Sequence, residues 1–81
     1  MNEVRAKIRG FVVENFLFGN EDGVKDDTSF LDEGIIDSTG ILEMVSYLEA
    51  EFSISVDDEE LVPENLDSIN NVFAYLEKKI G

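Results

Sequence analysis

Helical periodicity recurs in three stretches of the sequence, at about residues 3–17, 38–51 and 69–80. In each stretch apolar side chains return every three or four residues, which places them on one face of an α-helix. These side chains are Val4, Ile8, Phe11, Val12 and Phe16; then Ile41, Leu42, Val45, Leu48 and Phe52; and finally Ile69, Val72, Phe73, Leu76 and Ile80. Met44 lies at the edge of the second face. No stretch has a convincing strand pattern, so the sequence predicts an all-α protein.

A long connection separates the first two predicted helices. Residues 18–34 break every periodicity and concentrate Gly, Asn and Asp, which favour turns and loops. We expect four apolar residues in this connection to anchor it to the core: Phe18, Val24, Phe30 and Leu31. Loops of this length are uncommon in compact domains and are often functional.

The connection before the last predicted helix, VDDEELVPENL, has room for one short helix. Pro63 disfavours helical geometry at Val62, and the acidic run of residues 57–60 would suit the start of such a helix. Asp67 or Ser68 is suited to cap the last helix. The sequence therefore predicts a single domain over residues 1–81, a small four-helix bundle of three main helices and a short third one.

Composition narrows the chemistry and the partners. The chain has no cysteine and no histidine, which removes disulfides, thiolate catalysis and the commonest general base. A formal net charge of −13 disfavours nucleic acid and anionic membranes and favours basic protein surfaces. No stretch has the apolar length of a signal peptide or a membrane span. We therefore expect a cytoplasmic monomer that is not an enzyme.

Two readings of the acidic residues fail on spacing and size. A calcium-binding EF-hand loop needs oxygen ligands at its first, third and fifth positions and glycine at its sixth. Counting from Asp22 puts Val24 third, and counting from Asp26 puts Phe30 fifth and Leu31 sixth. A pair of catalytic carboxylates would need an apolar cleft that raises the pKa of one of the two carboxyl groups. A bundle of this size gives no indication of such a cleft. We predict neither a metal site nor catalytic residues.

Ser38 opens the second predicted helix and has two interpretations. Asp37-Ser38 before an apolar periodic run is an ordinary helix start, in which either side chain caps the first turn. However, Gly40 and Ile41 occupy the positions where a capping box has Glu or Gln, and glycine weakens a first turn. An exposed serine to which an anionic group is attached would also suit this place, because helix N-termini bind phosphates.

The chain resembles the acyl carrier proteins, or more broadly the phosphopantetheine-binding carrier domains. The similarity spans nearly the whole length and is most specific over residues 34–38, Gly-Ile-Ile-Asp-Ser. The helix that follows matches through Leu42, Val45, Leu48, Glu49 and Phe52. Asp-Ser alone is weak evidence, but in this order of elements within a short acidic chain it is specific.

The resemblance implies that Ser38 carries 4′-phosphopantetheine, transferred from coenzyme A by a phosphopantetheinyl transferase. The arm's thiol would hold an acyl or aminoacyl group as a thioester, loaded by a ligase and passed to downstream synthases or transferases with basic surfaces. Asp37 would help the transferase to bind. Partner enzymes would read the helix through Thr39, Glu43, Ser46 and Glu49.

Two features depart from the commonest fatty-acid carriers. Thr39 and Gly40 follow the serine, where leucine usually comes first, and the segment before the last helix is longer and contains Pro63. We therefore expect a dedicated pathway for an amino acid, a hydroxy acid or an unusual acyl group as readily as primary fatty acid synthesis. The alternative is an acidic helical interaction module with an unmodified Ser38.

Overall fold

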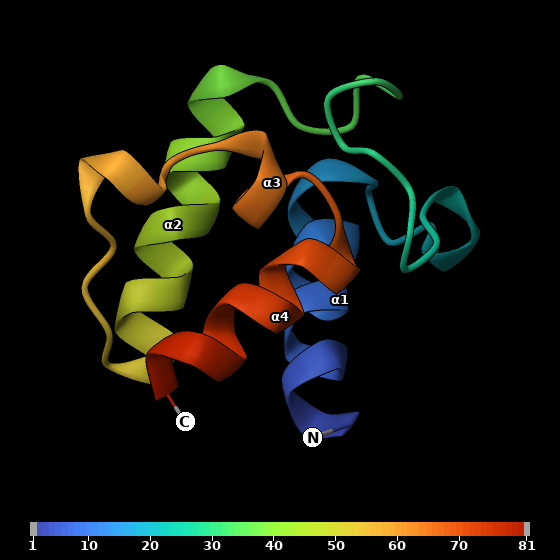
Figure 1. Ribbon diagram of the computed structural model, residues 1–81. Coiled ribbons are helices and arrows are strands. Elements are labelled where there is room, and N and C mark those ends of the chain that lie inside the picture. Colours follow the sequence, from blue (N-terminus) through green and yellow to red (C-terminus); the bar gives the residue numbers. More distant parts are fainter. Residues whose placement is uncertain (1, 81) are drawn as a thin grey trace.

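The computed structural model describes residues 2–80, without the side chains of Asn2 and Glu21. Four α-helices follow one another along the chain: α1 (Asn2–Phe16), α2 (Ser38–Phe52), α3 (Pro63–Leu66) and α4 (Ile69–Ile80). Two 3-10 turns, Glu21–Gly23 and Asp58–Glu60, lie in the connections, and the described residues contain no strand. Figure 1 shows α4 beside α1, with the one-turn α3 near the upper half of α2. The predicted all-α class is confirmed, and the three long helices begin and end within one residue of the expected positions.

The second connection differs from the prediction in one respect. The acidic run does not begin the short helix, because Asp58–Glu60 form a separate 3-10 turn. Val62 is extended, with φ −127° and ψ 151°, as expected before proline, and α3 starts at Pro63. Proline suits the first position of a helix, since the amide hydrogen it lacks would have no partner there.

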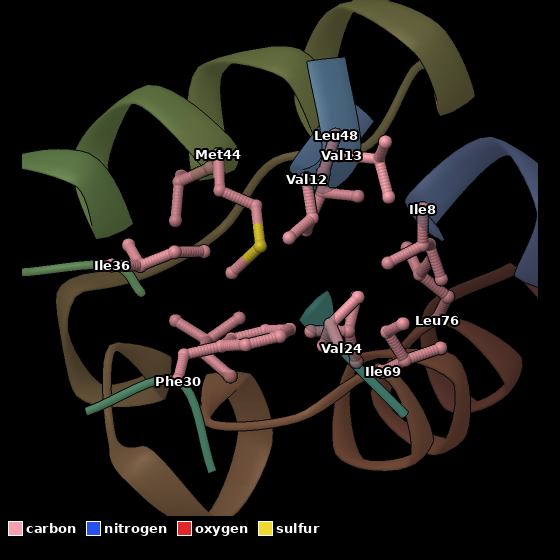
Figure 2. Packing of buried hydrophobic residues seen from close by; sticks show 13 residues of the cluster. Ile8, Val12, Val13, Val24, Phe30, Ile36, Met44, Leu48, Ile69 and Leu76 are labelled. Carbon is pink, nitrogen blue, oxygen red and sulfur yellow. The ribbon is translucent and has the colours of Figure 1, made fainter. Parts of the chain in front are cut away.

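One cluster of buried apolar side chains joins the long helices, α3 and the long connection. Figure 2 shows Phe30 reaching into this cluster from the loop, facing Met44 and Ile36. Phe30 and Val24 are buried, as predicted, and so is Met44. Phe18 and Leu31 do not anchor the loop, because 97% and 42% of their surfaces are exposed. Leu31 directly follows the buried Phe30 in a turn, and Phe18 lies in the turn that ends α1.

Polar contacts supply the remaining anchors of the long connection. The Asp26 carboxylate accepts hydrogen bonds from Arg5 at 3.5 Å and from Arg9 at 2.5 Å, both on α1. At the other end, the Asp67 carboxylate accepts from the Ser29 hydroxyl at 2.5 Å and from the Leu31 amide at 2.9 Å. Asp67 is therefore not the cap of α4. The cap of α4 is Ser68, whose hydroxyl accepts a hydrogen bond from the amide of Asn71 at 3.1 Å.

No helix within residues 2–80 combines the length and the apolar character needed to span a bilayer.

Candidate functional site

The start of α2 is capped by Asp37, which leaves the next side chain free of that task. Asp37 has extended geometry, and its Oδ1 atom accepts the amide hydrogen of Gly40 at 2.8 Å. Ser38 is the first helical residue and is exposed to solvent. Of the two capping candidates that the sequence left open, the structure therefore selects Asp37.

Gly40 has a packing reason that the sequence did not reveal. It is buried, and an added Cβ would lie 2.7 Å from Ile36 Cγ2 and 2.9 Å from Phe16 Cε1. Carbon atoms at such distances clash, so only glycine lets the first turn of α2 approach the end of α1 this closely. The weak helix residue beside Ser38 is thus explained by packing, and it no longer argues for an attached group.

An apolar hollow of about 360 Å³ opens beside Ser38. Its walls come from the end of the long connection, from α2 and from the segment around α3: Leu31, Ser38, Ile41, Leu42, Leu61, Val62, Pro63, Leu66 and Asp67. We call these nine residues the Ser38 groove. Ser38 belongs to the lining, so a group attached to its side chain would have an apolar surface close by.

Leu42 is the main correction within the groove. The periodicity placed it in the core, but 56% of its surface is exposed. The reason is that α3, which faces this part of α2, has only four residues and does not cover it. Leu31, Leu61 and Val62 were also missed as site residues, since they lie in segments without periodicity. The apolar pair Leu61-Val62 within an acidic run was the one available signal.

The predicted recognition residues divide into two kinds. Thr39 and Glu43 are exposed and line a second hollow of about 310 Å³ on the other side of the helix start, and Ser46 is exposed as well. Glu49 is partly buried, and its Oε2 atom accepts the amide hydrogen of Val56 at 2.9 Å. Glu49 therefore holds the chain that leaves α2, in addition to any contact it makes with a partner.

Glu60 fixes the far wall of the groove. Its Oε1 atom accepts hydrogen bonds from the amide of Asp57, the hydroxyl of Tyr75 and the amine of Lys79, each at 3.0 Å. These contacts, the Asp57 amide foremost, lower the pKa of the Glu60 carboxyl. Burial, followed by the hydrogen bond to Glu60, raises the pKa of Tyr75. The turn that precedes Leu61 is thereby tied to α4.

Within residues 2–80, no group of three or more carboxylate side chains is arranged to hold a metal ion.

Comparison with known proteins decides the family. The model of a family described as "Phosphopantetheine attachment site" matches residues 7–76, which include α2 and the Ser38 groove. The chain belongs to this phosphopantetheine-attachment family. The resemblance seen in the sequence is thus confirmed, and with it the kind of prosthetic group, a covalently bound 4′-phosphopantetheine.

Relatives of this phosphopantetheine-attachment protein are similar over almost their full length. The acyl carrier protein of Bdellovibrio bacteriovorus is 37% identical over 76 residues, which cover 94% of each chain. That of Akkermansia muciniphila is 36% identical over 80 residues, covering 99% of this chain and 96% of its own. The probable acyl carrier protein PigG of a Serratia species is 25% identical over 75 residues, covering 93% and 86%. Acyl carrier proteins carry groups for biosynthetic enzymes and are not catalysts themselves.

The start of α2 fits such a prosthetic group. Attachment needs an accessible hydroxyl, which Ser38 offers. The helix start favours the negative charge of a phosphodiester. The arm would find the apolar wall of Leu42 and Val62 next to it, both at least one-third exposed.

Proposed function

We propose that Ser38 is the residue to which 4′-phosphopantetheine is attached, and that this protein shuttles acyl or aminoacyl groups between enzymes. The observation that carries the proposal is the exposed Ser38 hydroxyl at the start of α2 and at the edge of the apolar groove. When bound, the group supplies a flexible arm whose terminal thiol holds the cargo as a thioester.

The residues around Ser38 support attachment by a separate enzyme. A phosphopantetheinyl transferase would join the Ser38 oxygen to the phosphorus next to the pantetheine of coenzyme A. The pyrophosphate bond of coenzyme A would break, and adenosine 3′,5′-bisphosphate would leave. A chain without histidine leaves the removal of the hydroxyl proton to the transferase. Asp37 orients the serine, because its carboxylate holds the first turn of α2 in place.

The protein's own part in the shuttle is to place the arm and to be recognised. Its net charge of −13 suits fast, modest binding to a series of basic enzymes, since complementary charge raises association rates. Thr39, Glu43 and Ser46 offer an exposed face next to the attachment point, with Glu49 at its edge. The chain itself contributes no catalytic group to the reactions of its cargo.

The test is the intact mass after incubation with coenzyme A and a phosphopantetheinyl transferase. We expect the wild-type chain to gain the mass of one phosphopantetheine and Ser38→Ala to gain nothing. Ser46→Ala is the matched control, since Ser46 is an exposed serine on the same helix and its loss should leave the gain intact. A wild-type chain that stays unmodified would favour the alternative, an acidic interaction module, and a gain that survives Ser38→Ala would place the arm elsewhere.

A further inference from the structure

Phe18 is the most exposed of the large apolar side chains in residues 2–80, with 97% of its surface accessible. Leu42, the next in order, is exposed to 56%. A single exposed apolar residue is common on protein surfaces and needs no explanation by itself. Phe18 differs because its backbone is unfavourable for a side chain as well.

The turn that ends α1 puts Phe18 where helices usually have glycine. Its φ angle is +53°, in the left-handed region. The amide of Gly19 donates to the carbonyl of Val13 at 2.9 Å, which closes a seven-residue turn at the end of α1, and the left-handed Phe18 directly precedes this donor. A β-carbon is disfavoured in this conformation, so glycine would relieve the backbone and remove an exposed ring together. Neither the fold nor the core accounts for phenylalanine here.

The position of this turn in the molecule suggests why residue 18 is a phenylalanine. The end of α1 and the start of α2 lie at the same end of the molecule, the upper end in Figure 1. They are in close contact, since Phe16 packs against Gly40, two residues after Ser38. The turn that carries Phe18 is thus at the same end of the molecule as Ser38, beside the exposed Thr39 and Glu43, which line a hollow together with Phe16.

We propose that Phe18 is a docking anchor for the transferase that modifies Ser38, whose surface would receive the ring in an apolar pocket with a basic rim. The inference rests on the function proposed above. Two exposed acids flank Phe18 along the chain, Glu14 on the last turn of α1 and Asp22 in the following 3-10 turn. Because these acids are negatively charged, we expect the rim of the transferase pocket to be basic. A second copy of this chain is a poor occupant, because each copy carries a charge of −13. Buried aromatic rings are typical anchors of protein interfaces.

The test compares two substitutions that relieve the same backbone conformation. Phe18→Gly and Ser53→Gly each put glycine at a left-handed residue that ends a helix, with φ angles of +53° and +54°. Both should leave the melting temperature unchanged or raise it. Only Phe18→Gly removes an exposed ring. We expect it to lower kcat/KM for modification of the full chain by a phosphopantetheinyl transferase about five-fold or more, mainly through a higher KM. Ser53→Gly should be modified like the wild type.

The outcomes separate this inference from the proposed function. Equal kcat/KM for Phe18→Gly and wild type, with the wild type fully modified, would overturn the docking role alone. A wild-type chain that gains no mass would overturn both. A wild-type dimer that Phe18→Gly converts to a monomer in sedimentation would make a second copy the occupant and also overturn the proposal.

Discussion

The two sides of the first turn of α2 are built for opposite purposes. On one side Gly40 is buried against Phe16 and Ile36, with no room for a single added carbon atom. On the other side Ser38 and Leu42 are exposed and line an apolar groove. A few consecutive residues thus combine a packed contact that admits no side chain with an exposed hydroxyl-bearing residue.

The packed side is what gives the open side a defined position. A serine on a mobile loop would be just as exposed, but its oxygen would have no fixed place relative to an enzyme. Here the contact of Gly40 with α1 fixes the helix start, and the Asp37 cap fixes the residue before it.

Gly40→Ala should destabilise the fold, although alanine is normally the better helix residue. The new methyl group would meet Ile36 and Phe16 below 3 Å, so we expect a loss of about 1–3 kcal/mol in the free energy of unfolding. Gly10→Ala is the matched control, because Gly10 lies inside α1 with no atom within 4 Å of its missing Cβ. It should stabilise by about 0.5–1 kcal/mol. Denaturant unfolding of both variants measures these changes in the free energy of unfolding. Changes of the same sign in the two variants would contradict tight packing around Gly40.

Asp37→Ala should cost less, about 1 kcal/mol, because it removes the hydrogen bond that caps α2. Asp37→Asn keeps an oxygen acceptor at the same place and should retain most of the stability. The pair also separates capping from recognition. If the transferase binds the negative charge, Asp37→Asn will be modified more slowly while its melting temperature stays near that of the wild type. Equal losses of stability in both variants would argue against the cap.

The helices and the helix start at Ser38 could be predicted because both are local features of the sequence. Apolar residues at three- and four-residue spacing predict a helix, and Asp-Ser before such a run predicts where the helix begins. Neither signal depends on the rest of the fold. The buried Val24 and Phe30 were also predictable, as apolar residues isolated in a polar connection. These features require no knowledge of how the helices pack.

Leu42 and Gly40 were misjudged because their surroundings depend on segments distant in the sequence, and Phe18 was misjudged because its exposure depends on the geometry of its turn. Periodicity tells which residues share a face, but the exposure of Leu42 depends on the shortness of α3. The burial of Gly40 depends on Phe16, a residue of another helix. Phe18 looked like an anchor because it is apolar, and only the backbone of the turn directs it into solvent. Packing partners and turn geometry are the information that one sequence lacks.

Glu60 lies directly before Leu61, at the wall of the Ser38 groove opposite α2, and its contribution to stability should depend on pH. Because its pKa in the folded protein lies below the ordinary 4.5, ionised Glu60 stabilises the fold above that pH. This contribution is lost as the pH falls through the lowered pKa. Glu60→Gln should therefore lower the melting temperature slightly at pH 7, and the difference from wild type should shrink below about pH 4.5. A difference that stays constant in acid would show that the charge does not tie this turn to Tyr75 and Lys79.

Leu42→Ala should have the smallest effect on stability, and it tests the open side most directly. A leucine with 56% of its surface exposed loses little burial on truncation, and alanine is a strong helix former, so we expect a change within about 0.5 kcal/mol. Leu48→Ala is the same substitution on the same helix at a fully buried position, and it should cost about 2–5 kcal/mol. Similar losses for the two variants would mean that Leu42 is covered in solution and that the groove beside Ser38 is closed. A large loss only at Leu48 would show that Leu42 is exposed and that the apolar wall of the groove is open, at little cost to the fold.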